Sequence, residues 1–188
     1  MLDVSDRLAV IIGGGRVATR KAIGLIDCGA TRVRVVAPAF DSDMPLQVQR
    51  VAETYQPRHL AEAQLAFAAT NSPAVNAQVV ADARERKIFI CRCDEGEPGG
   101  DFVTPARFRD GDVLVSVSAG SAALSAAVRD DLEARFDPRY AKMAAAMTKL
   151  RPLIKSEQTS ADARRTWVHG LAGAEALATL DAVGIEAL

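Results

Sequence analysis

The sequence is poor in the residues that build disulfide frameworks, histidine metal centres and large aromatic cores. It has three cysteines, two histidines and one tryptophan among 188 residues, and aromatic side chains make up 5%. Cys28, Cys91 and Cys93 are too few and too unevenly spaced for a disulfide framework, so a reducing cytoplasm is the expected location. His59 and His169 stand far apart in no ligand-like cluster, which argues against a histidine-based metal centre.

Strong charge of one sign and long apolar runs are also missing. The formal net charge is −1 and lysine and arginine form no block, which argues against nucleic acid or an anionic membrane as the main partner. No apolar stretch is long enough to cross a bilayer, and residues 1–7 do not resemble a signal peptide. What the chain does have is 49% hydrophobic residues, enough for a substantial core at this length.

Strand-like and helix-like patterns alternate in the first half of the chain. Apolar runs predict strands at residues 8–12, 33–37, 65–69 and 88–91, with a weaker candidate at 51–55, and helical spacing occurs at 17–28 and 75–86. This alternation is typical of βαβ units on a parallel sheet, so we expect an α/β, Rossmann-like fold.

From about residue 100 the pattern changes to a hairpin followed by helices. Two β-like runs, 102–108 and 113–118, flank a turn signal at Arg109-Asp110-Gly111-Asp112, and Pro105 inside the first run suggests an edge or a bulge. The later helical patterns cover residues 124–135, 139–155, 161–171 and 174–182. We therefore expect a nucleotide-binding domain at 1–99, a hairpin region at 100–136 and a helical C-terminal domain at 137–188.

The most informative stretch is a glycine turn between the first strand and the first helix. Residues 13–18, Gly-Gly-Gly-Arg-Val-Ala, satisfy the pattern G-x-G-x-x-A. Gly13 permits the tight turn, Gly15 lets the backbone approach a pyrophosphate, and the small Ala18 lets the helix pack on the strand. Because the turn follows a buried strand and opens a helix, it favours dinucleotide binding over a purely structural turn.

The sequence does not by itself choose between NAD and NADP. An acid at the end of the second strand commonly holds the ribose of NAD, but Pro38 and Ala39 stand there and Asp41 is the nearest acid. Arg32 and Arg34 lie on the strand rather than beyond it, so a pocket for a 2′-phosphate is not evident either.

Two further residues follow the ends of predicted strands, where ligands of open α/β sheets bind. Thr70 follows the strand at 65–69 and is placed to hydrogen-bond a cofactor, although the same segment is also a normal strand-to-helix turn. Asp94 follows the strand at 88–91 and is either a general acid or base near the nicotinamide or a solvated loop acid. Cys91 and Cys93 share a strand face, and without a nearby histidine their spacing favours packing over metal binding.

Four motifs, in order, resemble the dehydrogenase module of siroheme synthases, the precorrin-2 dehydrogenase and sirohydrochlorin ferrochelatase family. They are "VIIGGGRVATRKAIGLIDCGATRVRVVAP", "FAATNSPAVN", "IFICRCDEGEPGGDFVTPARF" and "VSVSAGSAALSAAVRDDLE". The resemblance implies a Rossmann half, a hairpin dimerisation region and a helical tail in a homodimer. It also implies oxidation of precorrin-2 to sirohydrochlorin with NAD, and in many members insertion of ferrous iron to give siroheme.

The resemblance also implies roles for individual residues. The family's key aspartate falls on Asp94, and the serine of its Ser-Pro turn falls on Ser121, a candidate for substrate binding. Because the macrocycle carries eight carboxylates, its cleft is expected to present cations, and Arg107 is a candidate together with Arg16, Arg20 and Arg92. The positions that match the family's cofactor-binding turns are Gly13, Gly15, Arg16, Val17, Pro38, Ala39 and Thr70.

Two departures from the family pattern lie near the expected tetrapyrrole site. Cys91 replaces an asparagine, and the turn at residues 118–123 lacks about two residues and a proline. These departures put substrate range and chelatase activity in doubt and leave the metal unknown. The alternative to an enzyme is a non-catalytic module that senses a dinucleotide or carries a tetrapyrrole, or a regulatory Rossmann domain of a larger assembly.

Overall fold

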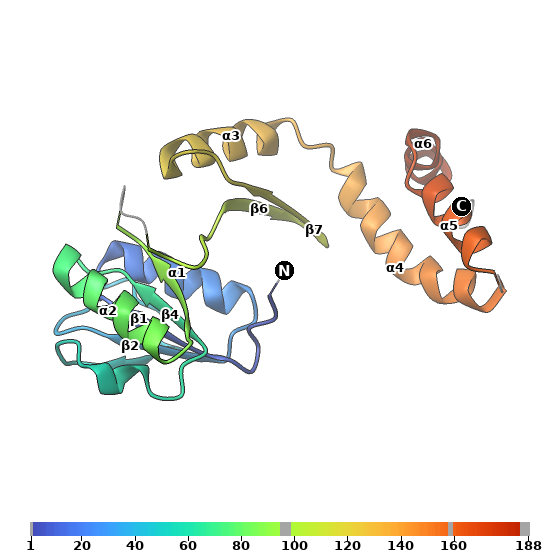
Figure 1. The fold of residues 1–188 in the computed structure, drawn as a ribbon. Helices are drawn as coiled ribbons and strands as arrows, with labels where there is room; N and C mark the ends of the chain where they lie inside the picture. The colour runs from blue at the N-terminus through green and yellow to red at the C-terminus, as the bar shows by residue number, and fades with distance from the viewer. Residues whose placement is uncertain (1, 95–98, 158–159, 185–188) are drawn as a thin grey trace. The chain divides into compact units, whose positions relative to one another are not determined.

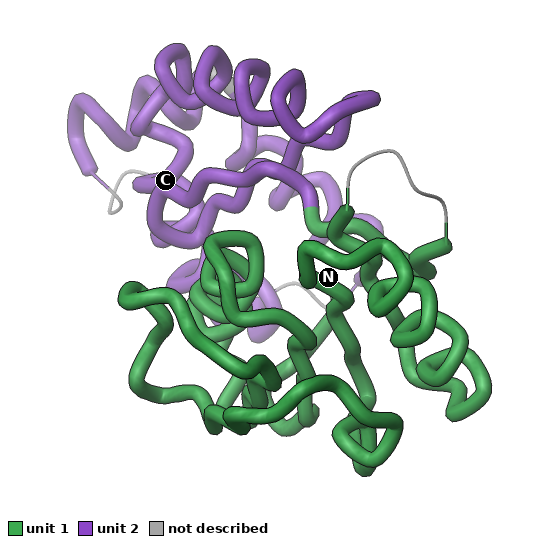
Figure 2. The backbone as a smooth tube through the Cα atoms, turned by 90° about the vertical axis from the view of Figure 1, so that its left-hand side faces the viewer, with its two compact units in different colours: residues 1–104 green, residues 105–188 purple. Residues whose placement is uncertain are grey.

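The chain folds into two compact units whose boundary lies between Thr104 and Pro105 (Figure 2). The structure, a computed structural model, describes residues 2–94, 99–157 and 160–184.

The first unit is built on a five-stranded parallel sheet with the order β3-β2-β1-β4-β5, of which β1, β2 and β4 are labelled in Figure 1. Ile12 at the end of β1 lies opposite Val36 of β2 and Ala68 of β4. The chain winds outward from β1 to β3 and then returns to β4 on the other side of β1. In open α/β sheets such a reversal, at the carboxyl ends of the strands, forms the ligand crevice. The strands are β1 (Leu8–Ile12), β2 (Arg32–Val36), β3 (Gln49–Val51), β4 (Leu65–Ala68) and β5 (Phe89–Arg92).

Helices cover both faces of this sheet because its central strands are apolar on both sides. All five residues of β1 are buried, as expected for a parallel strand between two helical layers. Helix α1 (Arg16–Asp27) packs its small residues on the face of Ile11 and Phe67. Helix α2 (Pro73–Glu85) packs on the opposite face, and the 3₁₀ turn η1 (Pro57–Leu60) adds Leu60 to that side.

The second unit is a hairpin followed by four helices. Strands β6 (Ala106–Asp110) and β7 (Val113–Val117) pair antiparallel around a two-residue turn in which Gly111 has a φ of +54°. The helices are α3 (Ala122–Ala134), α4 (Arg139–Glu157), α5 (Ala161–Leu171) and α6 (Ala174–Val183). A small apolar cluster joins α4 and α6. Within the described residues, no helix combines the length and apolarity needed to cross a membrane.

The α/β, Rossmann-like sheet, the hairpin and the helical tail expected from the sequence are confirmed. The strand expected at 102–108 is wrong for its first four residues, because β6 begins only at Ala106. Pro105 has no N–H to donate to a ladder. Phe102 instead packs edge to face against Phe67, with ring centroids 5.6 Å apart, and so belongs to the core of the first unit.

Candidate functional site

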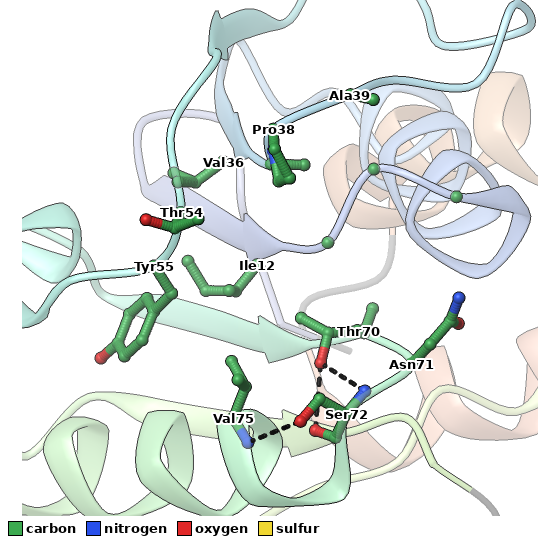
Figure 3. Close-up of a pocket in the computed structure, with 15 residues that line it drawn as sticks. Ile12, Val36, Pro38, Ala39, Thr54, Tyr55, Thr70, Asn71, Ser72 and Val75 are labelled. Carbon is green, nitrogen blue, oxygen red and sulfur yellow. Dashed lines mark hydrogen bonds between the residues drawn. The ribbon is translucent and has the colours of Figure 1, made fainter.

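A cleft of about 500 Å³ lies at the carboxyl ends of β1, β2 and β4 (Figure 3). Its walls are the glycine turn, the residues that follow β2 and β4, and the start of α2. The lining residues are Ile12, Gly13, Gly14, Gly15, Val36, Ala37, Pro38, Ala39, Thr54, Tyr55, Ala69, Thr70, Asn71, Ser72 and Val75. None of these side chains carries a charge.

The three glycines of the turn have different structural roles. Gly13 has a φ of +126°, and a Cβ there would lie 2.2 Å from the carbonyl oxygen of Ala69. A Cβ on Gly14 would lie 2.0 Å from the carbonyl oxygen of Ala39. A Cβ on Gly15 would meet no atom within 4 Å. Gly13 and Gly14 are therefore required by the protein's own backbone, whereas the open space at Gly15 is available to a ligand.

The amino terminus of α1 follows this open position. Gly15 is its N-cap, no side chain caps the helix, and its first turn has no acidic residue. Free N–H groups and the helix dipole make such an end suitable for a pyrophosphate. Arg16 is exposed and Val17 is half-buried against the core, and neither lines the cleft.

The end of β2 gives the cleft a neutral wall. Pro38 and Ala39 line it, and that they contact a cofactor stays a prediction. Asp41 lies outside the lining, and its carboxylate accepts a hydrogen bond from the backbone N–H of Asp43 at 3.0 Å. The acid nearest to β2 is therefore used in a local turn.

Thr70 is connected to a buried asparagine that sequence reasoning did not single out. Thr70 Oγ1 donates to Asn76 Oδ1 at 2.7 Å, and the Thr70 N–H donates to the same oxygen at 3.1 Å. Asn76 Nδ2 donates in return to the Thr70 carbonyl at 3.0 Å. The hydroxyl proton of Thr70 is thus used inside the protein, and its oxygen already accepts a hydrogen bond from the Ser72 N–H at 3.1 Å, which leaves one lone pair as a further acceptor.

The same asparagine reaches the candidate catalytic acid. A hydrogen bond from Asn76 helps to lower the pKa of Asp94, after the larger contribution of Arg92. Arg92 Nε donates to Asp94 Oδ1 at 2.8 Å and its terminal nitrogen donates to Oδ2 at 2.7 Å. The side chains of this pair are only 10% and 17% exposed. Asp94 is therefore ionised at neutral pH, and Arg92, a candidate substrate cation, is paired with it.

Replacement of Asn76 by alanine is expected to destabilise the fold by about 2–3 kcal/mol. Asn76 is fully buried, and its loss leaves the backbone polar groups of Thr70 without their partners. The exposed neighbour Asn71 provides a matched control, since Asn71→Ala should change the free energy of unfolding by less than about 0.5 kcal/mol. Urea unfolding of both variants checks this, and equal midpoints would contradict it.

Two cysteines lie beside this acid, on the α1 side of the sheet. Cys91 Sγ and Cys93 Sγ are 3.9 Å apart. The neighbouring Cys93 thiol lowers the pKa of Cys91 to about 7, although burial opposes this shift. For Cys93, the hydrogen bond with Cys91 and burial both raise the pKa. The ammonium group of Lys21 lowers the pKa of both thiols.

The two candidate substrate-binding residues lie in the second unit. Ser121 is the N-cap of α3, and its Oγ accepts from the Leu124 N–H at 3.2 Å. Arg107 is half-buried on β6, and its carbonyl accepts from Arg129 at 3.4 Å. That either residue contacts a substrate stays a prediction.

Sequence reasoning also missed Thr54 and Tyr55, which follow β3 and line the cleft. Tyr55 Oη donates to the buried carboxylate of Asp82 at 2.7 Å, and burial and this bond raise its pKa. The weaker strand expected at 51–55 is wrong beyond its first residue, because β3 ends at Val51, so the sequence pattern did not place these two residues at the end of a strand. Asn76, in contrast, could have been found from the sequence, because it is the last residue of the motif "FAATNSPAVN" that resembles the siroheme synthases.

The chain has relatives among known proteins. A family model described as "Putative NAD(P)-binding" matches residues 1–106. The siroheme synthase of Nitrosospira multiformis is 35% identical over 185 residues, which cover 92% of this chain and 39% of that protein. The siroheme synthase of Photobacterium profundum is 33% identical over 170 residues, which cover 87% of this chain and 36% of that protein. The chain thus spans less than two fifths of the length of these curated relatives.

Among solved structures, SirC, precorrin-2 dehydrogenase, matches with a TM-score of 0.77 at 23% identity, covering 96% of this chain and 92% of that one. This likeness shows the fold. The relatives confirm the resemblance to siroheme synthases that the four motifs carried, and the family model spans more than half of the chain. The chain therefore belongs to the NAD(P)-binding family that this model describes.

Proposed function

We propose that the protein oxidises precorrin-2 to sirohydrochlorin with NAD, in the formation of siroheme. The observation that carries the proposal is the open approach at Gly15 beside an uncapped helix end, together with the half-buried, ionised Asp94 that follows β5, two strands away from β1. The siroheme synthases that resemble the chain support the choice of substrate.

The cleft suits a dinucleotide whose phosphates are bound by backbone groups. The N–H groups at the start of α1 would hold the pyrophosphate, and Pro38 and Ala39 would face the ribose. A 2′-phosphate is usually accommodated by an arginine, and no charged side chain lines the cleft, which favours NAD over NADP. When bound, NAD supplies a hydride acceptor.

Asp94 is the candidate proton acceptor. The oxidation removes a hydride and a proton from the macrocycle, and an ionised carboxylate at the sheet edge can take the proton. The hydrogen bonds from Arg92 lower the pKa of Asp94, which keeps its carboxylate ionised at neutral pH but also makes it a weaker base. Arg107 and Ser121 are proposed to contact the carboxylates and rim of the tetrapyrrole, and orientation of the two rings is then the protein's main contribution.

Anaerobic incubation with enzymatically made precorrin-2 and NAD, without added metal, tests the proposal. The visible spectrum should convert to that of sirohydrochlorin only when NAD is present. Measurable NAD binding without conversion would overturn the proposal and favour the sensing or carrier module.

The ferrochelatase activity implied by the resemblance stays a prediction. Ferrous ion would be a substrate of that step, so adding it to the sirohydrochlorin product and following the siroheme spectrum tests the prediction separately. An unchanged rate relative to the protein-free control would contradict it.

A homodimer is proposed for the second unit because α3 exposes a stripe of apolar side chains. Leu124, Val128 and Leu132 recur every four residues and are 52%, 37% and 43% exposed, and a two-stranded hairpin alone is marginally stable. Replacing Leu124 and Val128 together by glutamate should convert the dimer to a monomer in sedimentation velocity. Leu153→Glu on α4, at a residue 57% exposed, is the control that should stay dimeric. A wild-type chain that sediments as a monomer would contradict the dimer.

A further inference from the structure

Cys91 and Cys93 are held with their sulfur atoms side by side at the end of β5. The Cys93 N–H donates to the Ala68 carbonyl at 2.9 Å, so the backbone pairing with β4 continues past the end of the strand. Residues two apart on an extended strand present their side chains on one face. The strand itself therefore fixes the separation of the two sulfurs, 3.9 Å.

That separation matches a shared metal ion better than a disulfide. Two thiolates at about 2.3 Å from a tetrahedral cation lie about 3.8 Å apart. A disulfide would require the sulfurs to approach to about 2.05 Å, with Cα atoms at most about 6.8 Å apart. Residues two apart on an extended strand are already separated by about 6.6 Å. A cation thus fits the existing backbone, whereas a disulfide lies at the limit of what the backbone allows.

The hydrogen bonds of the thiols do not compete strongly with a cation. Cys91 Sγ donates to the Arg92 carbonyl at 4.0 Å, and Cys93 Sγ donates to the Cys91 carbonyl at 3.8 Å. Both distances are at the long end for sulfur. Cys91 is 3% exposed, while Cys93 is half-buried at the edge of the apolar cluster, so a cation would approach from the side of Cys93.

We propose that Cys91 and Cys93 form a two-thiolate binding site for a thiophilic divalent cation such as Zn²⁺ or Co²⁺. Binding forms two metal–sulfur bonds and releases to solvent whatever protons the two thiols still carry. In the described part of the chain, no group of three histidine, cysteine or acidic side chains is arranged to hold a metal. Among the described residues the site thus offers two protein ligands, and water or an exchangeable ligand would complete a tetrahedral set. This binding is separate from the proposed dehydrogenation and needs neither NAD nor tetrapyrrole.

Titration of the reduced, full-length protein with Co²⁺ alone, under anaerobic conditions, tests the proposal. The sulfur-to-cobalt charge-transfer absorption should appear and saturate at one Co²⁺ per chain, and Zn²⁺ should abolish it by competition. Cys91→Ser and Cys93→Ser should each weaken Co²⁺ binding by at least about 10-fold. Loss of a residue that only hydrogen-bonds a metal ligand already lowers metal affinity by about this factor. Cys28→Ser is the matched control, because Cys28 is exposed at the end of α1 and its loss should change nothing.

Two results would overturn the proposal. One is the absence of the charge-transfer band in the reduced wild-type protein. The other is a band that survives in the Cys91→Ser, Cys93→Ser double variant. If serine at the buried Cys91 prevents folding, the titration of Cys91→Ala and Cys93→Ala gives the same discrimination.

Discussion

Replacing Asp94 by asparagine is expected to lower the rate of precorrin-2 oxidation by about 10²- to 10⁴-fold, the usual contribution of a general acid or base. The amide occupies the same volume but has no basic lone pair to accept the proton. Because Asp94 does not line the cleft at the glycine turn, the affinity for NAD should stay within about twofold. Single-turnover kinetics and NAD titration of the same preparation check both parts.

Two further variants separate a chemical role of Asp94 from a structural one. Asp41→Asn removes an acid that serves a local turn, so it should leave the rate nearly unchanged. Arg92→Gln removes the main cause of the lowered pKa of Asp94. In the wild type, kcat/KM should therefore hold as pH falls to values below the ordinary aspartate pKa of 3.8. In Arg92→Gln, the acid limb should move to higher pH. An acid limb that does not move would show that Asp94 is not the titrating group.

The second large effect is expected from alanine substitutions at the adjacent Gly14 and Gly15, one of which should lower stability and the other NAD affinity. Gly14→Ala places a Cβ 2.0 Å from the carbonyl oxygen of Ala39, and neither backbone segment can rotate away as a side chain would. The substitution should destabilise the fold by about 3 kcal/mol, the upper part of the usual range for overpacking. Thermal unfolding checks this.

Gly15→Ala should leave stability unchanged but weaken NAD binding. Gly15 has a φ of −88°, which alanine adopts without strain, and its Cβ would meet no protein atom. The methyl group would instead occupy the approach of the pyrophosphate. Loss of one charge-assisted hydrogen bond, about 1.5–3 kcal/mol, corresponds to about 10- to 150-fold weaker binding. If Gly15→Ala bound NAD like the wild type, the phosphates would not lie at this turn.

Local patterns in the sequence predicted most of the fold. The apolar runs at β1 and β4 are short, continuous and bounded by turn residues, so their type and their order along the chain follow from the local sequence pattern. The glycine turn could be assigned because it stands between a buried strand and a helix. The strand expected from residue 102 was wrong because Phe102 belongs to the core of the first unit, a contact with Phe67 that no local pattern encodes.

The candidate site was less predictable because its contacts join separate elements. The bonds of Asn76 to Thr70 and to Asp94 depend on the register of β4 and β5 and on where α2 begins. The pairing of Arg92 with Asp94 likewise depends on how the chain turns after β5. A sequence shows that such residues are present, but their partners are decided by tertiary packing.

The different surroundings of the three glycines bear on how such turns are interpreted in other chains. At Gly13 and Gly14 any larger residue collides with the empty protein itself, so selection for folding alone would keep both glycines after a cofactor was lost. At Gly15 folding imposes no such requirement, and only a ligand would exclude a side chain. In a degenerate relative, Gly15 is thus the position whose loss would mark the end of dinucleotide binding.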